Sequence, residues 1–388
     1  MLTSIDEKDY TSFYLHWPFC LSKCPYCSFN SYAIAEIINF NEWREAYFWA
    51  IKLFAKQYQN KIIRSVYFGG GTPSLLPSSL VKDILNEIQH YWDFCEDVEI
   101  TLEINPETAE ESKIRGYREA GINRVSVGMQ SMYDEGLAIL GRGHSVEASI
   151  ATMKLCLDLF KSVSVDMIYA RPGHSVKIWE QELKQLFALS PHHLSLYQLT
   201  IENETVFGNM FRKGELLLPD DNTCSDLFEV TQSLTREHGL PAYEISNHAK
   251  AGHECVHNMR YWLYEDYIGI GPGAHSRVTI DGCKYALAHE TNPRKWLRAL
   301  LEHQEILEER LKLTPQEQAR EAILVGLRMT DGLDYRKIPL PLEQCIDYPA
   351  MERLIEEGYI ELEGNILRCT HEGRKCLNSV LLLLLASL

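Results

Sequence analysis

The sequence lacks an excess of basic residues, a hydrophobic run long enough to cross a membrane, and an export signal. Its 388 residues include 38 Lys and Arg against 54 Asp and Glu, so the net charge is −16. That balance argues against a general nucleic-acid binder, which needs a basic face. Residues 1–9 contain no basic stretch followed by an apolar core, so no secretory signal is expected. We therefore expect a cytoplasmic protein with no nucleic acid as partner.

The longest apolar run lies at the C-terminus, in residues 380–388, and consists mostly of leucine. A membrane-spanning helix needs about 20 such residues, so this run is too short to span a bilayer. We expect a terminal helix that packs on its own domain, with peripheral contact to a membrane or a partner as the alternative. The sequence does not define the oligomeric state.

The eleven cysteines do not form the regular framework of a secreted disulfide scaffold. Eight are scattered, and we expect most of them to be small buried hydrophobic residues. The other three form a C-x3-C-x2-C motif at Cys20, Cys24 and Cys27. Iron–sulfur clusters normally take four cysteine ligands, so three would hold a [4Fe–4S] cluster with one iron open to another ligand. A zinc site fits less well, because no second cysteine pair occurs at zinc-ribbon spacing.

Residues 1–200 alternate between short strand patterns and longer helical patterns. The expected strands are rich in β-branched and aromatic residues and cover 13–17, 63–68, 98–104, 124–128, 163–169 and 193–200. The expected helices cover 41–58, 79–92, 109–120, 145–160 and 176–189, with Asn41 as a cap of the first and Gly121 after the third. Six βα repeats predict an α/β fold with a parallel sheet, in the form of an open, partial (β/α)6 barrel.

The C-terminal region follows a different pattern. Thr314 precedes a proline and a glutamate at the first turn of an expected helix. A second helix (351–357), two strands (359–362 and 366–369) and the terminal helix complete a small winged-helix-like domain. We divide the chain into a barrel (1–240), a connecting region that packs on it (241–305) and this C-terminal domain (306–388).

Polar motifs follow the expected strands, where functional residues of such folds collect. Gly69-Gly-Gly-Thr-Pro73 follows the second strand, and glycines there let the backbone approach a ligand closely. Taken alone, the glycine run also fits an ordinary turn. Glu103 ends the third strand, where its carboxylate is suited to hydroxyl or ammonium groups but also fits a solvated strand end.

Four motifs together resemble the radical S-adenosylmethionine (SAM) superfamily: Tyr14-x-His-x-Pro-Phe-Cys20 with its cysteine triplet, Gly69-Gly-Gly-Thr-Pro73, Glu103-Ile-Asn-Pro106 and Val127-Gly-Met-Gln-Ser131. Within it, they resemble the oxygen-independent coproporphyrinogen III oxidase family and its HemW-type branch of haem chaperones. The motifs occur in the order and spacing of that family, and the resemblance covers nearly the whole chain.

The resemblance implies a [4Fe–4S] cluster on Cys20, Cys24 and Cys27, with SAM at the open iron. It implies SAM contacts from a further set of residues, which are Tyr14, Tyr26, Gly70, Gly71, Thr72, Glu103, Gln130, Arg142 and Asp166. Arg142 is suited to the SAM carboxylate. Thr200 and His275 match the family's SAM contacts more loosely.

A second motif, His257-Asn-Met-Arg-Tyr-Trp262, matches the H-N-x-x-Y-W motif associated with haem in the HemW type. It offers an imidazole for haem iron at His257 and two aromatic rings for the porphyrin at Tyr261 and Trp262. His253 and Cys255 are further candidate iron ligands. The alternative is a loop of buried aromatic residues with a structural histidine.

One departure from the oxidases concerns Phe29. The oxidases carry a fourth cysteine two residues after the triplet, where this chain has Phe29, and this chain has less sequence before its first strand. The resemblance therefore favours a haem chaperone that delivers haem to acceptor haemoproteins. Oxidative decarboxylation of coproporphyrinogen III is the alternative function. The sequence therefore does not decide whether the protein is an enzyme. Radical-SAM modification of RNA is a third alternative, which the acidic charge disfavours.

Overall fold

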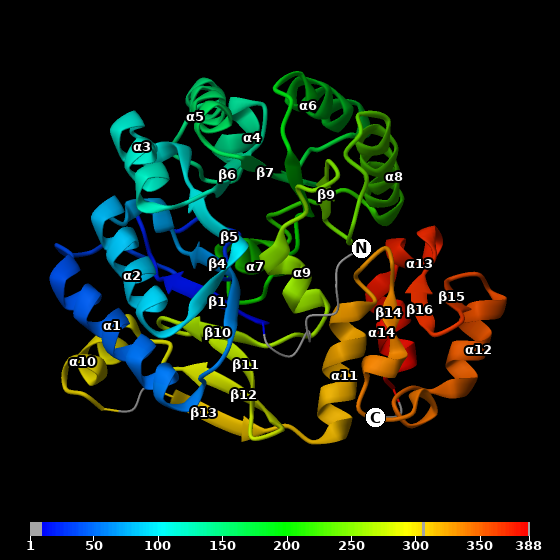
Figure 1. Ribbon diagram of the computed structural model, residues 1–388. Helices are drawn as coiled ribbons and strands as arrows, with labels where there is room; N and C mark the ends of the chain where they lie inside the picture. Colours follow the sequence, from blue (N-terminus) through cyan, green and yellow to red (C-terminus); the bar gives the residue numbers. More distant parts are fainter. Residues whose placement is uncertain (1–9, 305–306, 387–388) are drawn as a thin grey trace.

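The computed structural model describes residues 10–304 and 307–386, and its centre is one eleven-stranded sheet that curves into an incomplete barrel (Figure 1). The prediction about residues 1–9 lies outside the described residues. In spatial order the strands are β13 (Leu307–Lys312), β12 (Cys283–His289), β11 (His275–Ile280), β10 (Tyr267–Ile270), β1 (Tyr10–Trp17), β4 (Ile62–Gly70), β5 (Asp93–Ile104), β6 (Arg124–Gln130), β7 (Ser162–Tyr169), β8 (His193–Gln198) and β9 (Asn247–Ala249).

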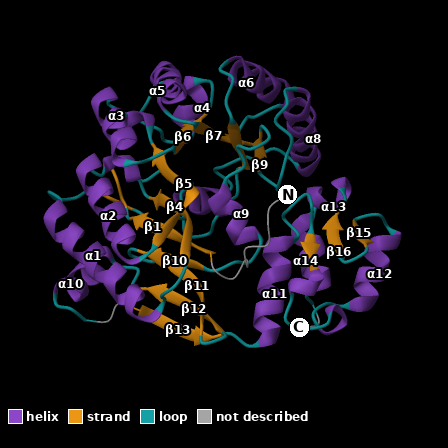
Figure 2. Cartoon of the chain, in the orientation of Figure 1, coloured by secondary structure: helices purple, strands orange, loops and turns teal. Residues whose placement is uncertain are grey.

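The predicted partial barrel is confirmed, because β1, β4, β5, β6, β7 and β8 pair in parallel in this order. Helices cover its outer side while the strands lie inside (Figure 2). They are α1 (Phe40–Gln57), α2 (Ser78–Tyr91), α3 (Glu111–Ala120), α4 (Asp134–Ile139), α5 (Val146–Leu159), α6 (Val176–Ala188), α8 (Asp221–Glu237) and α10 (Pro293–Leu301). The short helix α7 (Val206–Arg212) lies near the centre of the view in Figure 1 instead, where Phe207 contacts Tyr26.

Two predicted helix ends have different outcomes. Gly121 ends α3 with a φ of 110°, which is the left-handed conformation that glycine adopts at low cost. The cap of α1, in contrast, is Asn39 and not Asn41 as predicted, because the Asn39 side chain accepts a hydrogen bond from the Asn41 backbone N–H. Both asparagines precede the apolar pattern, and the sequence alone does not show which one leaves the helical conformation.

The region after residue 240 extends the sheet at both ends. β10 lies parallel to β1, on the side opposite β4, and the antiparallel strands β11, β12 and β13 continue from it. β9 is antiparallel to β8 at the other end. Between them, the short helix α9 (Val256–Trp262) contacts β4.

Side chains alternate across the strands, and this alternation gives the barrel a polar interior. On β1, Phe13 and Trp17 point outward, where their rings contact Trp92 and Trp43 respectively. The alternate residue Ser12 is fully buried and accepts a hydrogen bond from Ser65 of β4 at 2.8 Å. The outward faces form the hydrophobic core with the helices, and the inward faces supply the polar groups of the site described below.

The C-terminal domain has its own core and the predicted winged-helix-like arrangement. Its elements are α11 (Pro315–Gly326), β14 (Leu333–Asp334), α12 (Tyr348–Glu356), β15 (Ile360–Glu363), β16 (Ile366–Cys369), α13 (His371–Lys375) and α14 (Leu377–Leu384). The leucine-rich α14 packs on its own domain as expected, with Val380 and Leu384 buried, although Leu382 remains 73% exposed. None of the helices in the described ranges combines the length and hydropathy needed to cross a bilayer.

Thr314 caps α11 as predicted, and this cap leads to a stability prediction. The Thr314 hydroxyl accepts from the Glu317 backbone N–H at 3.2 Å, while the Glu317 carboxylate accepts from the Thr314 backbone N–H at 2.7 Å. Thr314→Ala should lower the free energy of unfolding by about 1 kcal/mol, because a helix N–H loses its partner. Urea denaturation measures this change. Thr314→Ser, which keeps the accepting oxygen, should stay close to wild type, and equal losses in both variants would contradict the capping argument.

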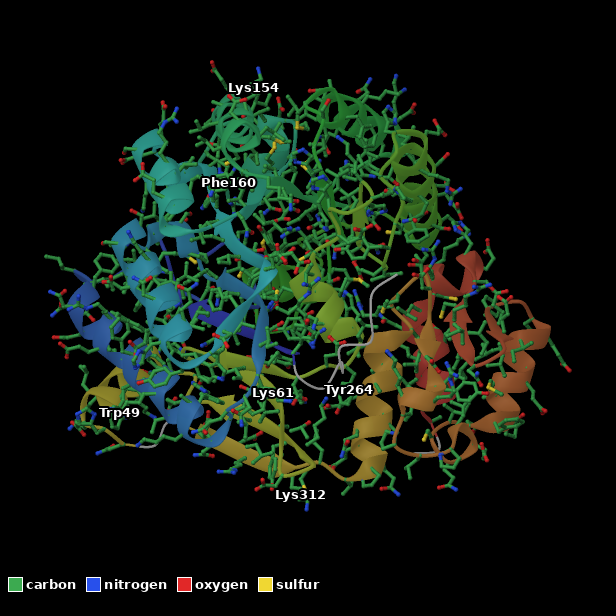
Figure 3. The ribbon with its side chains drawn as sticks, in the orientation of Figure 1. Trp49, Lys61, Lys154, Phe160, Tyr264 and Lys312 are labelled. Atoms are coloured by element: carbon green, nitrogen blue, oxygen red, sulfur yellow. The ribbon has the colours of Figure 1, made fainter. Side chains whose placement is uncertain are left out.

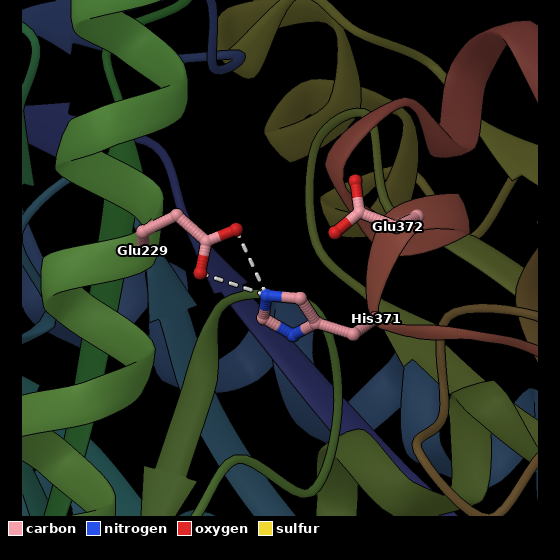
Figure 4. A group of neighbouring side chains, drawn as sticks. All are labelled: Glu229, His371 and Glu372. Atoms are coloured by element: carbon pink, nitrogen blue, oxygen red, sulfur yellow. Dashed lines mark hydrogen bonds and ion pairs between the residues drawn. The ribbon is translucent and has the colours of Figure 1, made fainter.

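Several polar contacts attach the C-terminal domain to the rest of the chain, among them Arg328 with Glu244. Tyr264, which lies beside α11 in Figure 3, donates to Glu321 at 2.7 Å, and Arg277 pairs with the same carboxylate. On the other side, His371 lies 2.8 Å from Glu229 of α8, with Glu372 close by (Figure 4). Lys375 Nζ lies 2.9 Å from Glu229 and 3.2 Å from Glu372, so these groups form an ion-pair network between the domains.

Candidate functional site

The cysteine triplet lies in a loop at the carboxyl end of β1. Cys20 ends the two-residue strand β2 (Phe19–Cys20), which pairs in parallel with β3 (Tyr32–Ala33). Lys23 Nζ closes the loop by donating to the carbonyl oxygens of Phe29 and Ser31 at 3.1 and 3.0 Å. The loop is therefore held at both ends, and its three cysteines face the mouth of the barrel.

The three thiols are free and partly buried, and all three line one cavity. Burial raises the pKa of Cys20. The triplet offers three thiolates, which leave one iron of a [4Fe–4S] cluster without a cysteine ligand.

A cavity of about 450 Å³ extends from this loop into the mouth of the barrel. Residues predicted from the motifs line it together, namely Cys20, Cys24, Tyr26, Cys27, Gly70, Gly71, Thr72, Glu103, Gln130, Arg142, Asp166 and Thr200. Several other lining residues had no role assigned from the sequence, and they are Asn105, Arg124, Ser126, Ser195, Tyr197 and Asn258. Arg124, Ser126, Ser195 and Tyr197 belong to β6 and β8, where the alternation of the strand was the available signal, whereas Asn258 belongs to α9.

The glycine loop lies directly against the cysteine loop. Gly70 has a φ of 113°, and a Cβ atom on it would come within 2.7 Å of the His16 ring. A Cβ atom on Gly71 would come within 2.7 Å of the Phe19 carbonyl oxygen and 3.0 Å of the Cys20 sulfur. Glycine is therefore required here for close packing, and the loop exposes its backbone to the cavity.

Two half-buried carboxyl groups, those of Glu103 and Asp166, line the same cavity. Burial, reinforced by the charge of Asp166, raises the pKa of Glu103 to about 8. Tyr67 donates a hydrogen bond to Glu103 at 3.0 Å, and Ser126 donates to Asp166 at 2.8 Å. Burial also raises the pKa of Asp166. The site is thus prepared for a ligand that carries positive charge or several hydrogen-bond donors.

Gln130 ends β6 in a conformation that other residues hold in place. Its φ is 67°, which is uncommon for a residue with a side chain. Arg171 donates to the Gln130 carbonyl oxygen at 3.1 Å, and Glu182 accepts from Ser131 Oγ at 2.5 Å. Arg171 and Glu182 pair with each other at 2.7 Å in the interior. This buried pair fixes the turn that points Gln130 toward the cavity.

Arg142 connects the cavity wall to the cysteine loop. Its guanidinium lies 3.6 Å from the Cys24 sulfur and donates to Asn105 and to the Gly128 carbonyl oxygen at 3.0 and 3.3 Å. Its Nε is buried without a hydrogen-bond partner in the described structure. The group therefore has donor capacity left for an anion or a sulfur atom within the cavity.

A second cavity of about 300 Å³ adjoins the first and shares Phe29, Gly70 and Glu103 with it. Its other lining residues are Tyr14, His16, Asn30, Tyr261, Tyr267, Gly273, Ala274 and His275. Tyr14, predicted to contact SAM, thus lies in this second cavity, where its hydroxyl is 3.0 Å from His16 Nδ1.

The residues of the His257–Trp262 motif do not all line the same cavity. His257 is 1% exposed, with Nδ1 2.9 Å from Ser65 Oγ and Nε2 3.2 Å from the Tyr261 hydroxyl. Burial lowers its pKa to about 3. Both ring nitrogens are engaged and His257 lines neither cavity, so its role as an iron ligand stays a prediction. Trp262 lies under the Arg328 guanidinium, away from both cavities.

The other two predicted iron ligands are also remote from the cavities. Cys255 is fully buried beside Glu99, and burial raises its pKa to about 12. His253 bonds to Ser162 at the amino end of β7, opposite the mouth, and stacks on His192 with 4.5 Å between ring centroids. Neither residue lines either cavity.

Comparison with known families and proteins agrees with this geometry. A model of the radical SAM superfamily matches residues 14–186, and a model of the HemN C-terminal domain matches residues 313–375. The heme chaperone HemW of Escherichia coli is 34% identical over 379 residues, which cover 97% of this chain and 98% of that protein.

Two further similarities extend over most of the chain. The mitochondrial radical S-adenosyl methionine domain-containing protein 1 of Danio rerio is 34% identical, over 95% of this chain and 86% of that protein. Coproporphyrinogen III oxidase (HemN) from Escherichia coli shares the fold, with a TM-score of 0.83 and 20% identity, over 98% of this chain and 91% of that one.

Proposed function

The chain belongs to the radical SAM superfamily and, within it, to the HemW type, and from this premise we propose that it is a haem chaperone. It binds a [4Fe–4S] cluster, SAM and haem, and it passes haem to acceptor haemoproteins in the cytoplasm. The observation that carries the proposal is the convergence of the cysteine triplet and the strand-end polar residues on one cavity. Phe29 lines the same cavity, and it occupies the sequence position at which the related oxidases have a further cysteine.

The residues of the cysteine loop suit the cluster. Cys20, Cys24 and Cys27, all free and partly buried on one cavity, would bind three of its irons. When bound, the cluster supplies an open iron for SAM and a reducing electron. Arg142, close to the Cys24 sulfur, would place positive charge beside the cluster.

The cavity wall suits SAM. Gly70, Gly71 and Thr72 would hold its methionine end close to the cysteine loop, and Arg142 would meet its carboxylate. Glu103 and Asp166 would accept hydrogen bonds from its ammonium and ribose groups. Gln130, fixed by the buried pair beneath it, would complete the wall. These roles are supported by the cavity, which brings the residues together from five separate strand ends and loops.

Haem binding by the wild-type protein tests the proposal. The cluster is reconstituted anaerobically, and haem is titrated while the Soret band is followed. The proposal predicts saturable binding of one haem per chain with a shifted Soret band. Absence of saturable binding in the reconstituted protein would contradict it.

The raised pKa of Glu103 predicts a pH dependence of SAM affinity. Below about pH 8 the Glu103 carboxyl is protonated and carries no charge for the ligand. As the pH rises from 6.5 to 8.5, the carboxylate forms, so the SAM dissociation constant should fall by up to about tenfold per pH unit below the pKa. Equilibrium binding to the reconstituted protein measures this trend. Glu103→Gln cannot ionise and should lose the part of the pH dependence that comes from residue 103, leaving the titration of the SAM amino group. An unchanged pH profile would remove Glu103 from the SAM site.

A further inference from the structure

The enclosed position of His257 leaves the haem iron without its expected ligand, and we propose that His275 ligates it in the second cavity. This inference rests on the proposed function, because it names the ligand and the place of the same haem. The structure supplies three independent features at this cavity, which are an accessible imidazole, aromatic walls and a common wall with the first cavity.

The imidazole of His275 is accessible and has no hydrogen-bond partner within the described ranges. His275 begins β11, and alternation along that strand puts it on the same face as Arg277, which pairs with Tyr267 of β10. His275, with Gly273 and Ala274 before it, forms one wall of the second cavity. Gly269 allows β11 to approach closely, since a Cβ atom there would come within 2.1 Å of the His275 carbonyl oxygen.

Aromatic rings from three other elements line the same cavity. Tyr14 of β1, Tyr261 of α9 and Tyr267 of β10 surround it, and Phe29, 64% exposed, stands at its edge. Flat rings of this kind suit the face of a porphyrin. A cavity of about 300 Å³ is at the lower end for small-molecule sites. A porphyrin seated there keeps one edge in solvent, which suits a ligand that must be passed on.

This arrangement also gives the His257–Trp262 motif a different role. Tyr261 lines the second cavity, and its hydroxyl is 3.2 Å from His257 Nε2. His257 is held in turn by Ser65 at 2.9 Å. His257 of α9 is therefore a positioning residue that orients the Tyr261 ring, and the iron ligand is His275 of β11.

Haem titration of single variants, in the full-length reconstituted protein, tests the inference. His275→Ala should raise the haem dissociation constant at least tenfold and change the Soret position, because the iron loses its imidazole. His90→Ala, at an exposed histidine near the end of α2, is the matched control and should bind as wild type does. His275→Gly with added imidazole should regain the wild-type spectrum.

The outcomes separate this inference from the proposed function. Unchanged affinity and spectrum in His275→Ala, with normal haem binding in the wild type, would overturn the ligand assignment alone. Failure of imidazole to restore the His275→Gly spectrum, while His275→Ala binds weakly, would likewise remove His275 as the iron ligand. Absence of haem binding in the wild type would instead contradict the proposed function. Circular dichroism of each variant confirms that the fold is retained.

Discussion

Anaerobically reconstituted Cys24→Ala is expected to hold almost no iron–sulfur cluster. A [4Fe–4S] cluster with three protein thiolates has no spare cysteine ligand, so removing one should reduce iron from about four per chain to near zero. The broad visible absorption of the cluster and tight SAM binding should disappear with it. Iron and sulfide analysis after gel filtration measures the loss.

Cys283→Ala is the matched control for that variant. Cys283 is a partly buried free thiol at the start of β12, and it lines neither cavity. It should retain the full iron content and SAM affinity. Equal iron content in Cys24→Ala and wild type would contradict the cluster assignment, and equal losses in both variants would point to nonspecific damage of the thiols.

The second large effect is expected for Glu182→Ala. Glu182 is fully buried and accepts hydrogen bonds from Arg171 at 2.7 Å and from the Met132 backbone N–H at 3.0 Å. Burial alone would raise its pKa, but hydrogen bonds from His174 and Ser131 and the Arg171 charge outweigh it, so the pKa is lowered. Removing the carboxylate leaves the buried Arg171 charge unpaired, which should cost about 3–5 kcal/mol of unfolding free energy.

A neighbour on the same helix provides the control for this prediction. Glu180 pairs with Lys184 on the surface, and Glu180→Ala should change the stability by less than about 0.5 kcal/mol. Chemical denaturation compares the two variants directly. The Glu182 variant should also bind SAM more weakly, because the turn that carries Gln130 loses its support. Similar stability of the two variants would contradict the structural role of the Arg171–Glu182 pair.

Regular alternation explains why the sequence predicted the barrel well. Each of the six βα strands has a hydrophobic outward face that packs on helices. In the sequence, such a strand is recognised as a short run of β-branched and aromatic residues between two helical patterns. The capping box at Thr314 was predictable for a similar reason, since its hydrogen bonds are local in sequence. The fold follows from such local signals, whereas the superfamily came from the resemblance of the sequence motifs.

Contacts between distant segments were not predictable. β10 pairs with β1 although more than 250 residues separate the paired positions in the sequence. The four residues of β10 do not indicate which strand it pairs with. The Ser131–Glu182 contact depends in the same way on how α6 packs against the end of β6. The burial of His257 depends on α9 lying against β4, which the motif alone does not indicate.

We propose that the chain carries haem and leaves coproporphyrinogen III unoxidised. One anaerobic reaction tests both parts, with the reconstituted protein, a reductant, SAM, haem and coproporphyrinogen III present together. Gel filtration then separates the protein, and the porphyrins in each fraction are identified by mass. We expect haem in the protein fraction and coproporphyrinogen recovered unchanged. Decarboxylated porphyrin products, with haem only in the unbound fraction, would contradict it.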